Sequence, residues 1–104
     1  MLKKYENAIK KAIREANKMD KDYNWKILLT KENEATFTWS YLSENDEPFK
    51  LEIESDSFVS VKVPYTGTCC GVLIGKHSWD DANTMEEGIA LVIKGAVLTA
   101  KKLF

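Results

Sequence analysis

The chain has 104 residues, of which 44% are hydrophobic and 30% charged, and its net charge at pH 7 is −1. This length and composition are typical of one globular domain with a single core and exclude a disordered chain. Arg14 is the only arginine beside 14 lysines. Because lysine lacks the bidentate fork that reads phosphates and base edges, this balance argues against specific nucleic-acid binding.

The longest mostly apolar stretch, residues 88–100, contains Lys94 and is too short to cross a bilayer. Residues 1–16 include lysines but no continuous apolar segment of the kind that a secretory signal needs. We therefore expect a cytoplasmic protein without a membrane partner.

The first predicted element is an amphipathic helix that begins near Leu2 and ends before residues 20–22. Apolar residues recur through it at helical spacing, and the basic residues collect on the opposite side. Residues 1–31 carry nine basic and four acidic side chains, whereas residues 32–56 carry one basic and eight acidic ones. The chain therefore has a basic end and an acidic middle.

Four segments with alternating apolar and polar residues follow, at residues 23–30, 35–42, 49–54 and 57–65. This period of two, with many aromatic and β-branched residues, is typical of half-buried antiparallel strands. Short polar links between the segments predict a meander with one apolar face. We expect the aromatic residues of that face to lie in the core: Trp25, Phe37, Trp39 and Tyr41.

Small residues at 66–71 predict a turn, residues 72–74 a short fifth strand, and residues 76–83 a loop. Thr84 and Glu87 then form a capping box, so the last helix should begin at Met85 and run almost to Phe104. The predicted fold is therefore α+β, in the order α-ββββ(β)-α. It is a two-layer fold, in which the N- and C-terminal helices pack on one face of a four- to five-stranded antiparallel meander.

The last helix is apolar on two sides. One side suits the sheet, and a second side carries Leu91, Gly95 and Leu98. This second side is a candidate interface, either with the first helix or with a second copy of the chain in a homodimer. Packing between elements of one domain favours the first helix.

The best candidate site spans residues 65–81, which hold both cysteines, the single histidine and a tryptophan. A nucleophilic cysteine, Cys69 or Cys70, activated by His77 is one interpretation. No third orienting group and no oxyanion hole accompany the pair, so a packing role for the cysteines is favoured. Two cysteines and one histidine are also too few for a structural zinc site, and we expect no metal or cofactor. The candidate binding residues here are Tyr65, Thr66, Thr68, Cys70, His77, Trp79 and Asp80.

Trp79 has two interpretations, a clamp that holds its loop to the core or an exposed anchor for a partner. The acidic hairpin around Glu44 and Glu47 is a further candidate surface, either for a basic partner or as an ordinary solubilising turn.

These patterns favour a non-enzymatic interaction protein that binds a protein partner as an inhibitor or adaptor. Small accessory proteins of phages and mobile elements, including anti-defence inhibitors, share this general type. The alternative is a protein that binds a small molecule or nucleotide with residues 65–81, either within one chain or at the interface of a dimer. A cysteine-dependent enzyme is the third class.

Overall fold

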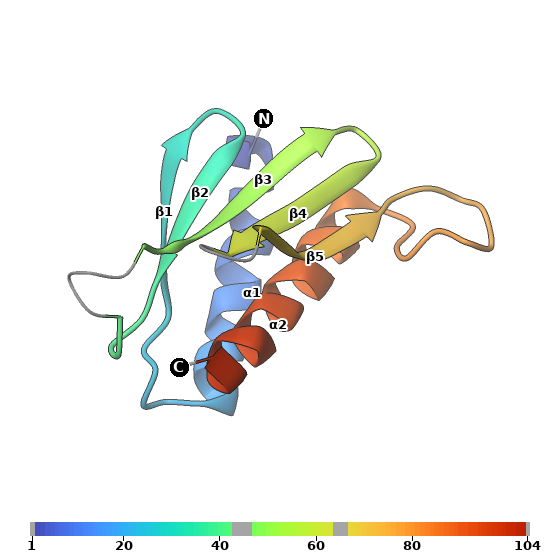
Figure 1. Cartoon of the computed structure of the whole chain (residues 1–104). Helices are drawn as coiled ribbons and strands as arrows, with labels where there is room; N and C mark the ends of the chain where they lie inside the picture. Colours follow the sequence, from blue (N-terminus) through green and yellow to red (C-terminus); the bar gives the residue numbers. More distant parts are fainter. Residues whose placement is uncertain (1, 43–46, 64–66, 104) are drawn as a thin grey trace.

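The computed structural model describes residues 2–42, 47–63 and 67–103 (Figure 1). The elements, in chain order, are η1 (Leu2–Tyr5), α1 (Glu6–Met19), β1 (Lys26–Lys31), β2 (Glu34–Thr38), β3 (Phe49–Ser55), β4 (Phe58–Val63), β5 (Gly67–Leu73) and α2 (Met85–Leu103). The strands form one antiparallel sheet in the order β1-β2-β3-β4-β5, and both helices lie on the same face of it. The predicted α+β fold is confirmed.

Strict alternation along the central strands builds the core. Phe37 of β2, Leu51 of β3 and Val61 of β4 are all fully buried, while their polar neighbours point to the opposite face. The register places Leu51 opposite Val61, and Val61 opposite Cys70 of β5. The core-facing side chains therefore form continuous rows across the sheet, against which the helices pack.

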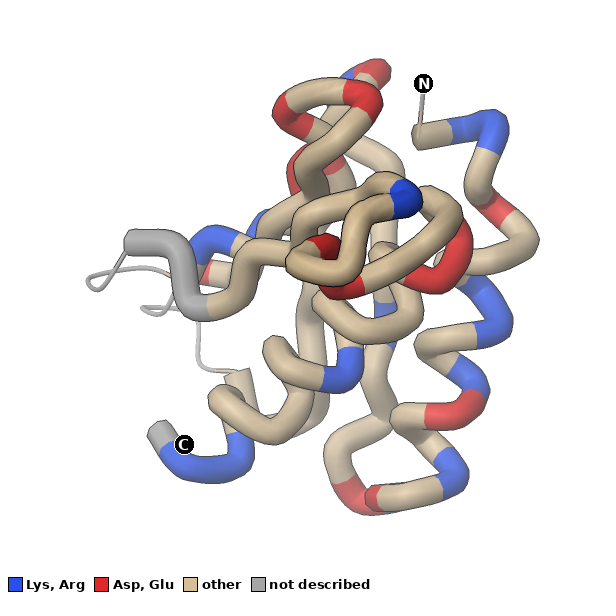
Figure 2. Tube along the Cα trace, turned by 90° about the vertical axis from the view of Figure 1, so that its right-hand side faces the viewer, with Lys and Arg blue, Asp and Glu red and all other residues tan. Residues whose placement is uncertain are grey.

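The two helices lie side by side and run in the same direction. Ala12 and Ala90 approach each other in the first half of the pair, and Lys101 of α2 binds Asp20 at the end of α1, with 3.1 Å between Nζ and Oδ2. The outer side of α1 carries the basic residues, drawn in blue in Figure 2. These are Lys10, Lys11, Arg14 and Lys18, and Lys3 and Lys4 of η1 precede them.

The fifth strand is longer than the sequence indicates. It runs from Gly67 to Leu73, so the prediction of a turn at residues 66–71 is wrong for the described part of that segment. Gly71 lies opposite Ser60, and a Cβ there would lie 2.6 Å from the ring of Phe58. Glycine at position 71 therefore leaves room for the ring of Phe58. Hydrogen bonding with β4 keeps this segment in a strand despite the low strand propensity of glycine.

The prediction that Tyr41 lies in the core is also wrong. β2 ends at Thr38, Trp39 is buried, and Tyr41 is 57% exposed with its ring edge against Tyr23. The neighbouring strand, β1, begins at Lys26 and not at residue 23 as predicted. The reason is that Asn24 has a φ of 49°, in the left-handed region, which is not a strand conformation. The alternating pattern therefore extends past both strand ends.

Candidate interaction site

The loop between β5 and α2 is held in place by its own hydrogen bonds. The backbone N–H groups of Asp81 and Ala82 both donate to the carbonyl oxygen of Leu73, at 3.0 and 3.1 Å. Gly75 N–H donates to the carbonyl oxygen of Ala82, at 3.0 Å. These bonds tie the two ends of the loop together, so the residues between them have a defined backbone path.

Two carboxylates complete this network. The N–H of Leu73 donates to Oδ2 of Asp81 at 3.0 Å, and the N–H of His77 donates to Oδ2 of Asp80 at 2.9 Å. A Cβ at Gly75 would overlap the carboxylate of Asp80, so glycine permits this close approach. The predicted binding residue Asp80 therefore accepts a hydrogen bond from within the loop itself, and Asp81, which was not among the predicted binding residues, holds the loop to the end of β5.

The capping box at the start of α2 is confirmed with one change. The Oγ1 of Thr84 accepts from the N–H of Glu87 at 3.2 Å, as expected for an N-cap. The Oε2 of Glu87 accepts from the N–H of Asn83, at 3.1 Å, one residue earlier than the capping box predicts. The junction between the loop and α2 is thus also held by hydrogen bonds.

The tip of this loop presents an aromatic stack. The rings of His77 and Trp79 lie 4.4 Å apart between centroids, with planes 3° apart. Trp79 is 69% exposed, whereas Trp25 and Trp39 are buried, with exposed fractions of 1% and 4%. The loop projects away from the sheet beyond β5 (Figure 1), so Trp79 is not a clamp on the core.

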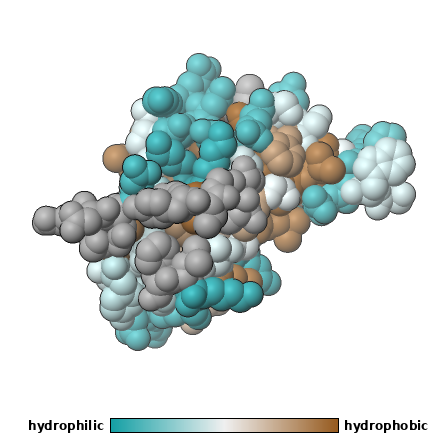
Figure 3. Space-filling view, in the orientation of Figure 1, coloured by the Kyte–Doolittle hydropathy of each residue, from teal (hydrophilic) through white to brown (hydrophobic). Residues whose placement is uncertain are grey.

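Apolar side chains lie on the sheet next to the base of this loop. Phe58 and Leu73 are opposite each other in the β4-β5 ladder and share the face away from the helices. Leu73 is 43% exposed, and Phe58 is half-buried. Figure 3 shows hydrophobic atoms gathered beside the projecting loop. We call Phe58, Leu73, His77 and Trp79 together the loop surface.

The cysteine–histidine pair has different neighbours in the structure. The sulfur of Cys70 lies 2.9 Å from the position that a Cβ on Gly95 of α2 would take. The side chain of Cys69 lies outside the described residues. The imidazole of His77 instead lies on Trp79. Within the described part of the chain, no group of three or more His, Cys, Asp or Glu residues is placed to hold a metal ion.

Several predicted binding residues lie outside the described residues. These are Glu44, Tyr65, Thr66 and the side chain of Thr68. Glu47, at the end of the acidic hairpin, is exposed.

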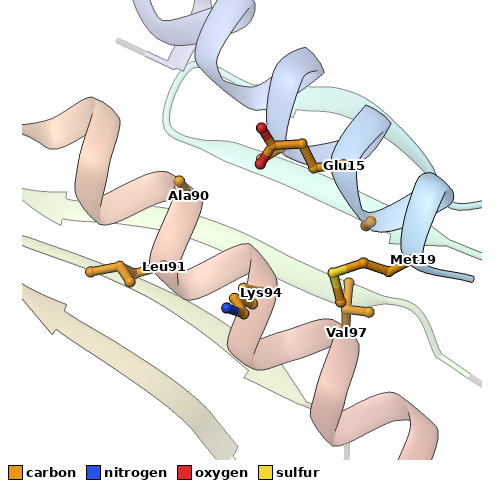
Figure 4. A pocket seen from close by; sticks show the side chains of 8 residues that line it. Glu15, Met19, Ala90, Leu91, Lys94 and Val97 are labelled. Atoms are coloured by element: carbon orange, nitrogen blue, oxygen red, sulfur yellow. The ribbon is translucent and has the colours of Figure 1, made fainter.

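The candidate interface on α2 divides into two parts. Gly95 faces Cys70, and Gly88 faces Ile74 and Val59, so the glycines let α2 approach the sheet closely. Leu91 and Leu98 stay 46% and 45% exposed. Leu91 lines the groove between the helices together with residues of α1, although its side chain is directed away from α1 in Figure 4, whereas Gly95 packs on β5. This side of α2 therefore does not pack on the first helix as one unit.

A shallow groove of about 190 Å³ lies where the two helices meet (Figure 4). Alanines on both helices leave this space because their side chains are short. Its lining residues are Ala12, Glu15, Ala16, Met19, Ala90, Leu91, Lys94 and Val97. The sequence pattern shows the alanines of α1 but cannot show that they lie opposite Ala90.

Comparison with known proteins found no matching family model, no matching curated protein and no matching solved structure. Among the described helices, none combines the length and apolar character needed to span a bilayer.

Proposed function

We propose that this protein is a non-enzymatic interaction domain that binds a protein partner through the loop surface, with Trp79 as the anchor. The observation that carries the proposal is the exposure of Trp79, 69%, on a hydrogen-bonded loop. Leaving a large apolar side chain in water forgoes roughly 1.5–3 kcal/mol of burial free energy. Tryptophan is also the residue type most enriched among binding hot spots.

The hydrogen-bonded loop favours binding because its backbone and the Trp79 side chain lose little conformational freedom when a partner binds. Asp81 and Ala82, at the far end of the loop, hydrogen-bond to Leu73, where the loop begins, and the stack on His77 limits the orientations of the indole. Immobilising a side chain on binding costs about 0.5–1.5 kcal/mol, and an anchor that is already held avoids part of this cost. Phe58 and Leu73 extend the apolar contact from the tip of the loop to the sheet.

A non-enzymatic role is supported by the placement of the reactive side chains. Cys70 packs toward Gly95 of α2, whereas His77 stacks on Trp79 in the loop beyond β5. A thiolate nucleophile needs a base within hydrogen-bond reach. Binding without chemistry is how an inhibitor or an adaptor acts.

The test is site-specific photo-crosslinking in lysate of the source cells. A benzophenone amino acid replaces Trp79 in one variant and Tyr41 in a matched control, since Tyr41 is exposed to a similar degree, 57%. We expect one protein to crosslink through position 79 and not through position 41. With that protein purified, Trp79→Ala should weaken binding at least tenfold and Tyr41→Ala less than twofold. Equal crosslinking at both positions, or unchanged affinity of Trp79→Ala, contradicts the proposal.

A further inference from the structure

Resting on the proposed function, we infer how the partner binds: it adds an extended segment as a sixth strand along the open edge of β5. The apolar side chains of that segment that face the helices would then pack on Leu91 and Leu98 of α2. Strand addition to an exposed sheet edge is a recurring mode of peptide recognition.

The two edges of the sheet differ in how they are protected. β1, at one edge, carries Lys26 and Lys31, and lysines on an edge strand oppose the addition of another strand. β5, at the other edge, has the sequence GTCCGVL without a charged residue. Of the two edges, only β5 lacks this charge protection.

The hydrogen bonds of Leu73 show which backbone groups β5 offers at this edge. Its N–H and C=O bind Asp81 and Ala82, away from β4, while the N–H of Ile74 binds Ser57 on the β4 side. In an antiparallel ladder these directions alternate, so the N–H and C=O of Gly71 also point away from β4. Gly71 is exposed. The backbone groups of Gly71 therefore face outward at the edge, whereas those of Leu73 are already bonded to the loop that carries Trp79.

Leu91 and Leu98 lie on the side of α2 that continues beyond this edge. Gly88 lies against Ile74, just after the end of β5, and Gly95 lies against Cys70 in the middle of β5. Each leucine follows one of these glycines by three residues, which turns it about 60° further from the core. Leu91 also lies at the edge of the groove between the two helices. The two leucines are about 10.5 Å apart along the helix. Alternate side chains of a strand are about 6.8 Å apart, so three successive inward-facing residues span both leucines.

The charges around the leucines favour an acidic partner segment: two lysines lie nearby, against one carboxylate, Glu87, whose Oε2 accepts from the N–H of Asn83. Lys94 lies between them in the sequence, Lys102 follows them, and both are exposed. A second copy of this chain is a poorer occupant, because a two-fold axis midway between Leu91 and Leu98 would bring Lys94 close to its own counterpart, one residue away along the helix. The occupant we infer is an extended segment with apolar residues at alternate positions, flanked by aspartate or glutamate.

The experiment selects binders for the full chain from a displayed library of random linear 12-residue peptides. The enriched sequences are synthesised with a fluorophore and used as probes. We expect alternating apolar residues with flanking acidic residues. The double variant Leu91→Ser/Leu98→Ser should weaken probe binding at least tenfold, and Lys94→Glu should weaken it several-fold. Leu28→Ser, a control at an exposed apolar residue of β1 (68%), should leave binding unchanged.

Amide hydrogen exchange on the unaltered chain gives an independent measurement. The bound probe should slow exchange at Gly71 by more than tenfold and leave β1 unchanged. Probes that bind the double-serine variant equally well, or that leave Gly71 unprotected, overturn the inference. A dimer in native mass spectrometry that the double-serine variant dissociates overturns it as well, because the second copy is then the occupant.

Trp79→Ala separates this inference from the proposed function. Probe binding along β5 should persist in that variant, because the contacts of the added strand lie on Gly71 and α2. Failure of crosslinking at position 79 with intact probe binding removes Trp79 as the anchor and keeps the edge site. Crosslinking at position 79 with no edge-binding probe keeps the proposed function and removes the added strand.

Discussion

The imidazole of His77 lies flat against the indole of Trp79, with 4.4 Å between ring centroids and 3° between ring planes. The two residues are only two positions apart in a loop that begins after Leu73 and whose far end, at Asp81 and Ala82, hydrogen-bonds back to Leu73. Stacking of this kind limits the motion of an otherwise exposed indole, and the indole then meets a partner in one main orientation. The predictions below test the contacts that hold this loop and the layers beneath it.

Asp81 should control the order of the loop. Asp81→Ala removes the acceptor for the N–H of Leu73, so the free energy of unfolding should fall by about 1 kcal/mol. Hydrogen exchange at Leu73 should become faster. Asp81→Asn keeps a side-chain acceptor and should restore most of the protection. Asp22→Ala, at an exposed position after α1, is the control and should change neither quantity. Unaltered exchange at Leu73 in Asp81→Ala would show that the bond does not hold the loop.

Asn17 should be the most sensitive polar residue of α1. Its Nδ2 donates to the carbonyl oxygen of Trp25 at 3.1 Å, and its Oδ1 accepts from the N–H of Trp25 at 2.6 Å. Asn17→Ala leaves both backbone groups unpaired in a half-buried position and should cost about 2–3 kcal/mol of stability. Asn17→Asp keeps only the acceptor and should cost about half as much. Urea unfolding measures both values against Asn7→Ala, an exposed control that should cost less than about 0.5 kcal/mol.

Gly95 and Cys70 should be energetically coupled. Gly95→Ala favours the helix by up to about 1 kcal/mol, but the new Cβ would lie 2.9 Å from the sulfur of Cys70. We expect Gly95→Ala to destabilise the protein alone and to stabilise it in a Cys70→Ala background, where the sulfur is gone. A double-mutant cycle from thermal unfolding should give a coupling of about 1–2 kcal/mol. Additive effects would place α2 further from β5 than the structure does.

Lys62 should titrate above its ordinary value. A hydrogen bond and charge attraction from Glu52, whose Oε2 lies 2.9 Å from Nζ, raise the pKa of Lys62 above 10.5. Because the folded pKa is raised, the stabilising contribution of this ion pair is present below pH 10.5 and is lost as the pH rises through the folded pKa. An NMR titration of the Lys62 side chain measures the shift. Glu52→Gln should lower the pKa toward 10.5, and an unchanged value in that variant would assign the shift to another group.

Local patterns were sufficient for most of the elements. The period of two along β3 and β4 and the helical spacing in α1 and α2 are properties of neighbouring residues, so they can be read without knowing the fold. The exact strand ends were not readable in this way. Apolar residues continue past the end of β2 at Thr38, and glycines within β5 imitate a turn, because only pairing with the neighbouring strand decides where a ladder begins and ends.

The sequence could predict which segment contains the candidate site, but not how its side chains are arranged. The sequence shows that residues 65–81 concentrate the unusual side chains, and that Trp79 is either a clamp or an anchor. The tertiary structure decided between these, because exposure depends on where the loop ends are tied, and Asp81 and Leu73 make that connection across eight positions.

Composition and periodicity by themselves determined the α+β class, the order of the elements and the apolar face of the sheet, since each follows from local burial requirements. The tertiary structure alone decided which side of α2 stays exposed. Gly88 and Gly95 looked like part of one surface with Leu91 and Leu98, yet the glycines meet β4 and β5 while the leucines remain in solvent. The physical reason is that a helical pattern gives angles around one axis, whereas contact depends on the distance to a neighbouring element, which no local pattern contains.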